Sequence, residues 1–308
     1  MCIKERNVSD STCKKLLRDK GCFADLCNYA FFQGRQVIQP EELVSRENDL
    51  STLIGKVDKP TEIKRYRDVV RKASIHGEYV IIGVEHQSTF DEKMIFRILN
   101  YDATIYINQV ESKQEVYPVG SFVFYTGDKE WKSPETLKET LKNIPPEMEP
   151  YINDWRLPVV ELKTIDARKL INQRLKEIVE ISQSMFAGNY DDLRNNRKIE
   201  IENFMMAATF TRTKIKREDL PEGDEINMCE AMDKLFQRFE NQGMEKGKII
   251  GFEKGKSDTL KEQLKVKLGT LSRPLEKQLT NTSLEKLNEL TLNIFNVTSE
   301  EDVLRIIN

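Results

Sequence analysis

The segment YVIIGVEHQS, residues 79–88, constrains the fold of this chain more than any other stretch. Six of the seven residues from Tyr79 to Glu85 are uncharged, and most are β-branched or aromatic, which predicts a strand buried on both faces. A carboxylate at the end of such a strand is costly to bury unless a cation or a hydrogen-bond donor meets it. Because side chains alternate along a strand, Glu85 and Gln87 should project from the same face. The sequence therefore predicts a polar site at the end of a buried strand.

A β-hairpin is predicted to bring a second carboxylate to Glu85. Strands are expected over residues 67–75 and 78–87, with a short turn around His76 and Gly77 between them. The centre of this turn lies midway in the sequence between Asp68 and Glu85. In an antiparallel pair the two residues should therefore lie opposite each other.

Two neighbouring carboxylates repel each other, and a divalent cation such as Mg²⁺, or Mn²⁺ or Ca²⁺, relieves the repulsion by taking their oxygens as ligands. Asp68 and Glu85 are thus the candidate metal ligands, and Gln87 could orient a water molecule by hydrogen bonding without titrating. Since side chains alternate along the strand, His86 should face away from Glu85. We expect it to be a core histidine or a hydrogen-bond donor that supports the site residues. A simpler alternative stays open, in which both carboxylates pair with Arg67 and Arg71.

Charge gives a mixed indication about nucleic acid. The net charge of −3 is not typical of a nucleic-acid-binding protein, but the stretch KRYRDVVRK at residues 64–72 is strongly basic. Lys64, Arg65 and Arg67 are therefore candidate contacts to DNA phosphates, since phosphate neutralisation supplies most non-specific affinity. The alternative is a solvated loop and strand edge.

Composition favours a protein that folds in the cytoplasm without a membrane segment. Of the 308 residues, 39% are hydrophobic and 32% charged, which is enough for one large or two ordinary domains with a well solvated surface. We find no run of about 18 apolar residues and no apolar signal segment at the start. The five cysteines form no Cys-x-x-Cys pair, so reduced structural thiols are favoured over a zinc site.

The order of the predicted elements indicates a mixed α/β core followed by helices. Helical segments are expected over 9–33 with Ser9 or Asp10 as the N-cap and a break at Gly21, over 91–110 and over 165–186, and further strands over 119–127 and 157–162. We divide the chain into a core at residues 1–162, a helical extension at 163–240 and a helical tail at 241–308.

The tail contains the near-repeat GMEKGKII-GFEKGKSD, with glycines at 243, 247, 251 and 255. On a helix, this spacing places the glycines on one slowly drifting face, which would permit close contact with a second helix and hence a homodimer. A flexible connector is the alternative. Further on, Thr282-x-x-Glu285 and Thr298-x-x-Glu301 are predicted to start two short helices as capping boxes.

Several of these motifs together resemble a known family. Asp68 followed by Glu85-x-Gln87 resembles the Asp…(Asp/Glu)-x-Lys core of the PD-(D/E)XK nuclease superfamily. More closely, the sequence is similar to the Rpn family of recombination-promoting nucleases, also known as PD-(D/E)XK family transposases. Four motifs carry the similarity. A Glu-x-Gln-Ser strand end is matched by Glu85, Gln87 and Ser88, and a Met-x-x-Arg-x-x-x-Tyr helix by Met94, Arg97 and Tyr101. A Tyr-x-Gly strand end with a nearby tryptophan is matched by Tyr125, Gly127 and Trp131, and an Asp-x-x-x-Lys opening by Asp10 and Lys14.

The resemblance implies a restriction-endonuclease-like core, a mixed sheet flanked by helices, and Mg²⁺-dependent DNA cleavage with a role in recombination. It also implies that Asp68 and Glu85 hold the metal, and that Gln87 stands where the superfamily has lysine. Asp10 becomes a candidate auxiliary acid, with a plain N-cap as the alternative. Arg97 becomes a candidate phosphate contact, with a salt bridge on the helix surface as the alternative. The alternative function is a transposase-derived protein that binds DNA or itself and cleaves weakly or not at all.

Overall fold

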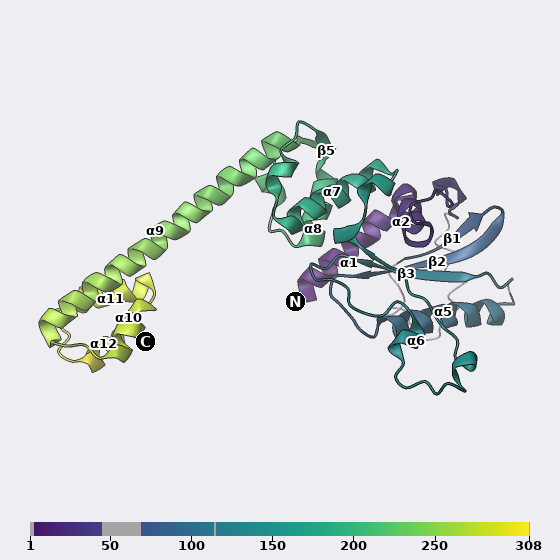
Figure 1. The fold of residues 1–308 in the computed structure, drawn as a ribbon. Helices are drawn as coiled ribbons and strands as arrows, with labels where there is room; N and C mark the ends of the chain where they lie inside the picture. The colour runs from purple at the N-terminus through teal and green to yellow at the C-terminus, as the bar shows by residue number, and fades with distance from the viewer. Residues whose placement is uncertain (1–2, 45–68, 114, 308) are drawn as a thin grey trace. The chain divides into compact units, whose positions relative to one another are not determined.

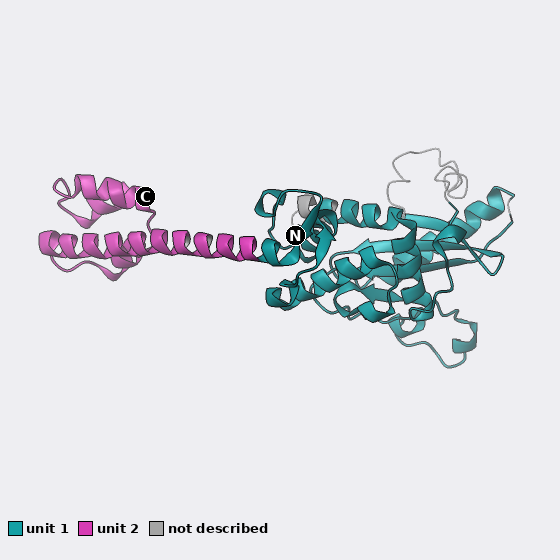
Figure 2. Cartoon of the chain, turned by 90° about the horizontal axis from the view of Figure 1, so that it is seen from above, with its two compact units in different colours: residues 1–232 teal, residues 233–308 magenta. Residues whose placement is uncertain are grey.

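The computed structural model describes residues 3–44, 69–113 and 115–307. These residues form two compact units, residues 1–232 and 233–308, which Figure 2 shows in different colours. The first unit holds a four-stranded sheet flanked by helices, so the predicted mixed α/β class and helical C-terminal region are confirmed (Figure 1). Within the described residues, no helix has the length and apolar character needed to cross a membrane.

The first unit begins with two helices and the predicted hairpin. Its main elements are helices α1 (Ile3–Arg18), α2 (Lys20–Phe32), α5 (Met94–Glu111), α6 (Leu137–Thr140), α7 (Gln173–Ala187) and α8 (Ile201–Thr211), and strands β1 (Val69–Ile75), β2 (Glu78–Gln87), β3 (Val119–Tyr125), β4 (Val159–Glu161), β5 (Lys198–Glu200) and β6 (Glu225–Asn227). In the described residues, six short 3₁₀ turns lie between them: η1 (Pro40–Glu42), η2 (Glu149–Tyr151), η3 (Leu162–Thr164), η4 (Ala167–Lys169), η5 (Tyr190–Leu193) and η6 (Arg217–Asp219).

The main sheet has the order β1-β2-β3-β4, with β1 antiparallel to β2 and the other neighbours parallel. Val69 pairs with Val84 and Ile75 with Glu78, which confirms the predicted register for every described pair of the hairpin. His76 and Gly77 both have positive φ values, of 53° and 89°, as a two-residue turn that follows the twist of the strands requires. Asp68 precedes this strand in the sequence and lies outside the described residues.

Helices cover both faces of the sheet (Figure 1). On one face α5 packs against β3 through a buried cluster that includes Ile98 and Val123. On the other face the rings of α2 and α8 meet β3, because Phe31 lies 5.5 Å from Phe122 and Phe210 lies 6.1 Å from Phe124. The sheet is thus buried on both sides, as the apolar β2 sequence predicted.

Two helix starts differ from the prediction. Ser9 and Asp10 lie inside α1 and not at its N-cap, because the helix begins at Ile3. The lysine, glutamate and arginine that precede them in the sequence are strong helix formers, so the chain is already helical before it reaches a capping residue. The helix expected from residue 165 begins at Gln173, after Asn172 accepts a hydrogen bond from the amide of Leu175 as the actual N-cap.

The second unit is helical throughout. It contains most of the long helix α9 (Met228–Leu268), followed by α10 (Arg273–Thr280), α11 (Leu284–Asn293) and α12 (Glu300–Ile307). A cluster of buried leucines, isoleucines and valines from all four helices forms its own core. Neither predicted threonine is the N-cap of its helix: the caps are the following residues, Ser283 and Ser299.

Candidate functional site

The carboxyl end of β2 holds the polar site that the sequence predicted. Glu85 is 5% exposed, and the Nε2 of Gln87 donates a hydrogen bond to its Oε1 at 3.2 Å. The two side chains share one face of the strand, so this prediction is confirmed. Since burial of a carboxylate is costly, the question at this site is which cation balances its charge.

Among the described contacts, Arg97 supplies that cation. Its Nη2 lies 2.9 Å from Oε1 of Glu85, and its Nη1 lies 3.0 Å from Oδ2 of Asp91. Arg97 thus takes the alternative predicted for it, a salt bridge, and bridges the end of β2 to the loop that follows. Burial lowers the pKa of the Arg97 guanidinium, but hydrogen bonds to Tyr101 and Asp91 and the charge of Glu85 raise it above its ordinary value overall.

The described contacts of Arg71 are with backbone carbonyls and an aromatic ring, and its predicted pairing with Asp68 lies outside the described residues. Its Nη2 donates to the carbonyl oxygens of Leu17 and Arg18 at 3.0 Å and 2.9 Å, and its guanidinium lies 5.1 Å from the ring centroid of Phe23. This side chain therefore caps the last carbonyls of α1 and ties that helix to the sheet. Arg67, Lys64 and Arg65 lie outside the described residues.

His86 lies on the opposite face from Glu85, as predicted. It is 2% exposed, with its Nδ1 3.0 Å from Oδ1 of Asp10 and its Nε2 2.8 Å from Oγ1 of Thr126. Thr126 in turn donates its amide N–H to the carbonyl oxygen of Gln87 at 2.8 Å. These bonds connect α1, the end of β2 and the residue after β3, and so fix the edge of the sheet that carries Glu85.

Asp10, the candidate auxiliary acid, therefore contacts His86 and belongs to the face away from Glu85. Its carboxylate can orient the imidazole ring and select its tautomer. The sequence did not reveal this contact, because Asp10 and His86 are 76 residues apart and no local spacing relates them.

Sequence reasoning also missed Asp91, Thr126 and Arg212. Arg212, at the end of α8, donates from its Nη2 to the carbonyl oxygen of Ser88 next to the site. Asp91 had a usable signal, since an acid just before a predicted helix commonly accepts hydrogen bonds from the first amides of the helix. Here Asp91 accepts from the amide of Lys93 at 3.0 Å as well as from Arg97.

The donor atoms at this edge suit a hard divalent cation. Glu85 offers a carboxylate and Gln87 an amide oxygen, and both are ligand types that Mg²⁺ and Ca²⁺ accept. Within residues 3–44, 69–113 and 115–307, no three histidine, cysteine or acidic side chains gather closely enough to hold a metal ion. Cys13, Cys22 and Cys27 are buried and form no disulfide within the described residues, as structural thiols are expected to be.

The Tyr-x-Gly strand end and the nearby tryptophan form one packed unit beside the site. Gln87 and Tyr125 are register partners on neighbouring parallel strands, and Trp131 lies 5.1 Å from the Tyr125 ring. A Cβ on Gly127 would lie 2.1 Å from the Tyr125 hydroxyl oxygen, so a side chain at this position would displace the ring. The glycine is therefore required by close packing.

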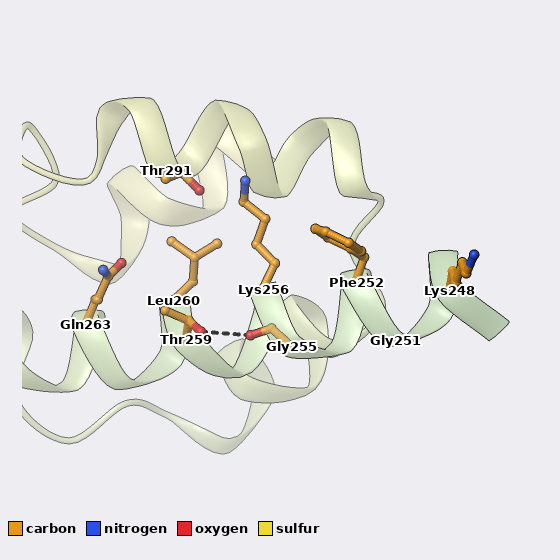
Figure 3. Close-up of a pocket in the computed structure, with 9 residues that line it drawn as sticks. All are labelled: Lys248, Gly251, Phe252, Gly255, Lys256, Thr259, Leu260, Gln263 and Thr291. Carbon is orange, nitrogen blue, oxygen red and sulfur yellow. Dashed lines mark hydrogen bonds between the residues drawn. The ribbon is translucent and has the colours of Figure 1, made fainter. Parts of the chain in front are cut away.

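The second unit contains a groove of about 650 Å³ along α9 (Figure 3). Figure 3 shows Phe252, Lys256 and Leu260 pointing into the space between α9 and a neighbouring helix, with Gly251 and Gly255 on the same stretch of α9. A Cβ added to any of the four repeat glycines would meet no atom within 4 Å. The contacts of a single chain therefore give no reason for the repeated glycines, and self-association stays a prediction.

Residues 61–212 match the model of a protein family described as "Putative transposase, YhgA-like". The matched segment includes the main sheet, α5 and the Glu85 edge, whereas Asp10 precedes it and the second unit follows it. No curated protein and no solved structure matches the chain.

Proposed function

Because the chain belongs to the YhgA-like putative transposase family, we propose that it is a metal-dependent DNA endonuclease that acts in recombination or in the processing of transposon DNA. The observation that carries this proposal is the buried carboxylate of Glu85 at the carboxyl end of β2, held next to Gln87 and Arg97. In this proposal the core is of the PD-(D/E)XK type, and Asp68, the residue that precedes β1, supplies the second carboxylate.

Each residue at the edge has a role in the proposed cleavage. Glu85 and Asp68 would hold Mg²⁺, or Mn²⁺ or Ca²⁺, which when bound polarises a phosphoryl oxygen and lowers the pKa of a water molecule. Gln87 orients the attacking water through its amide, and because an amide does not titrate, this side chain cannot take the proton itself.

The surrounding cations would bind the DNA backbone. Lys64, Arg65 and Arg67 contact phosphates along the basic stretch that leads to β1. Arg97 holds Glu85 and Asp91 in the described contacts, and a phosphate that enters the site offers its guanidinium a further acceptor. His86 and Asp10 act through the backbone of the edge and do not touch the reacting atoms.

The decisive experiment is cleavage of supercoiled plasmid in the presence of Mg²⁺, Mn²⁺ or Ca²⁺. We expect wild type to nick the plasmid and Asp68→Ala and Glu85→Gln to lose most of that activity. Glu78→Gln is the matched control, because Glu78 is an exposed carboxylate at the other end of the same strand. No cleavage by wild type with any of the three ions, or normal cleavage by both site variants, would contradict the proposal.

A second candidate function is DNA binding or self-association with little or no cleavage. Two observations favour it: Gln87 stands where the superfamily has lysine, and Arg97 already balances the charge of Glu85. Under this alternative, wild type binds DNA but does not cut it, and neutralisation of Lys64, Arg65 and Arg67 weakens binding and reduces its salt dependence.

A further inference from the structure

Three aromatic rings run outward from the Glu85 edge and form what we call the aromatic ridge, Tyr125, Trp131 and Phe90. The Trp131 ring lies 5.1 Å from Tyr125 at 69° and 5.3 Å from Phe90 at 75°, both edge-to-face arrangements. Tyr125 is 1% exposed, whereas Phe90 is 41% exposed. The ridge therefore begins in the core and ends as a phenyl ring in solvent.

The ridge is held in place by the loops that carry it. Ser133 donates its hydroxyl to the carbonyl oxygen of Glu92 at 3.4 Å, which joins the loop after β3 to the loop after β2. The amide of Trp131 donates to Oε2 of Glu161 at 3.2 Å. Because these contacts fix the rings before any ligand arrives, a ligand that stacks on them loses little free energy to ordering.

The position of the ridge relates it to the candidate site. Tyr125 is the register partner of Gln87, and Phe90 lies in the loop between Gln87 and Asp91. Asp91 binds Arg97, which binds Glu85, so the same short loop carries both the exposed ring and a member of the site. If a DNA phosphate binds at the Glu85 site, the sugar and base next to that phosphate would lie near the aromatic ridge.

We propose that the aromatic ridge stacks an unpaired base of the DNA, so that the substrate is single-stranded or locally unpaired DNA. The inference rests on the proposed function and specifies its substrate class. Every base has a π face that stacks on an aromatic side chain irrespective of sequence. A base inside a duplex is stacked on its neighbours, and it reaches a ring beside the backbone only after it leaves the stack.

Charge near the ridge agrees with recognition by stacking. Lys93 and Lys132 are exposed beside it, but so are Glu92 and Glu130, and both loops carry a mixture of cations and acids. This mixture does not provide a uniformly positive surface for any DNA backbone, so a contact at the ridge would come from stacking on the ring. The exposed phenyl ring is consequently the feature that would distinguish one DNA form from another.

Fluorescence of Trp131 tests the inference independently of cleavage. The chain has two tryptophans, so Trp155→Phe leaves Trp131 as the sole one. We expect a 12-nucleotide thymidine oligomer, added in EDTA so that no cleavage occurs, to change its emission, and an abasic oligomer of equal length or the same sequence in a fully paired duplex to change it far less. Circular dichroism of the variant checks that it is folded.

Substitution at Phe90 completes the test. In the Trp155→Phe background, Phe90→Ala should weaken binding of the thymidine oligomer by about 5- to 150-fold, the range expected for one base–aromatic stack, while Phe90→Tyr retains it. Phe96→Ala is the matched control, since Phe96 is 43% exposed but lies outside the ridge. Equal affinity for thymidine and abasic oligomers, or unchanged affinity in Phe90→Ala, overturns the ridge proposal even if the plasmid is cut at the Glu85 site. Failure to bind or cut any DNA overturns the proposed function as well.

Discussion

At the scale of single residues, the chemistry of this chain depends on how the charge of Glu85 is balanced. Among the described contacts, Arg97 and Gln87 both donate to the same oxygen of Glu85, the first as a cation and the second as a neutral donor. A divalent ion at this carboxylate must therefore compete with a guanidinium that is already 2.9 Å away. Competition of this kind can be measured.

Arg97→Gln should bind Mn²⁺ more tightly than wild type, by roughly tenfold, because a hydrogen bond to a charged group contributes about 1.5–3 kcal/mol and the metal no longer has to displace it. Without metal the same variant should be less stable, since Glu85 is left buried with its charge unbalanced. Isothermal titration gives the affinity, and the melting temperature with and without Mn²⁺ gives the stability.

Asp91→Asn is the control for this prediction. It removes the second acceptor of Arg97 but leaves the cation beside Glu85, so Mn²⁺ affinity should stay close to the wild-type value. Weaker Mn²⁺ binding by Arg97→Gln would show that Arg97 helps to build the metal site and does not compete with the ion.

The sequence predicted which side chains share a face at this edge, because alternation along a strand fixes Glu85 and Gln87 on one side and His86 on the other. It did not predict their partners. Arg71, the cation expected on the neighbouring strand, binds carbonyl groups at the end of α1, whereas the cation on Glu85 comes from α5. Partners of this kind depend on how helices dock on the sheet, which local spacing does not encode.

At the scale of elements, the β1–β2 hairpin was predictable because one short turn fixes the register of a whole strand pair. The termini of helices were less predictable. Thr298-x-x-Glu301 and Ser299-x-x-Asp302 are offset by one residue, and both fit the pattern of a capping box. In the structure Ser299 accepts from the amide of Asp302, while Asp302 accepts from the amides of Thr298 and Ser299.

The cap of α12 should make this helix sensitive to acid. Hydrogen bonds from the Thr298 amide, then from the Thr298 and Ser299 hydroxyls, lower the pKa of Asp302 to about 2. Since an unfolded aspartate titrates near pH 4, the carboxylate stabilises the folded helix above about pH 4, and this contribution is lost as the pH falls through about 2. The amide resonances of Thr298 and Ser299 in the full chain should shift with a midpoint near pH 2.

Asp302→Asn should remove this titration and increase amide hydrogen exchange in α12 at neutral pH, because an amide oxygen is a weaker acceptor than a carboxylate. Glu301→Gln is the neighbouring control and should leave both measurements unchanged. A midpoint near pH 4 in wild type would mean that the cap does not form as described.

At the scale of the whole molecule, the two units differ in kind. Residues 1–232 contain the sheet and the candidate site, and most of this unit lies in the segment that matches the family. Residues 233–308 form a separate helical core, with α9 common to both units. Along α9 the four repeat glycines, Ile250 and Phe252 are exposed, so this helix presents apolar and small side chains without cover from its own chain.

Replacement of Gly251 and Gly255 by alanine distinguishes a dimer contact from a connector. Each exposed glycine in a helix interior lowers stability by roughly 1 kcal/mol relative to alanine, so a connector should become more helical and more stable with no change in mass. If the glycine face packs against a second copy, the added methyl groups hold the two helices apart, and the double variant should sediment as a monomer at concentrations where wild type is a dimer. We expect the second result, because the four glycines of α9 make no close contact within the described part of the chain.

Glu262→Ala is the control, because Glu262 is exposed on the same helix, and this variant should have the same mass as the wild-type dimer. A wild-type protein that is monomeric at every concentration would instead identify the repeat as a connector.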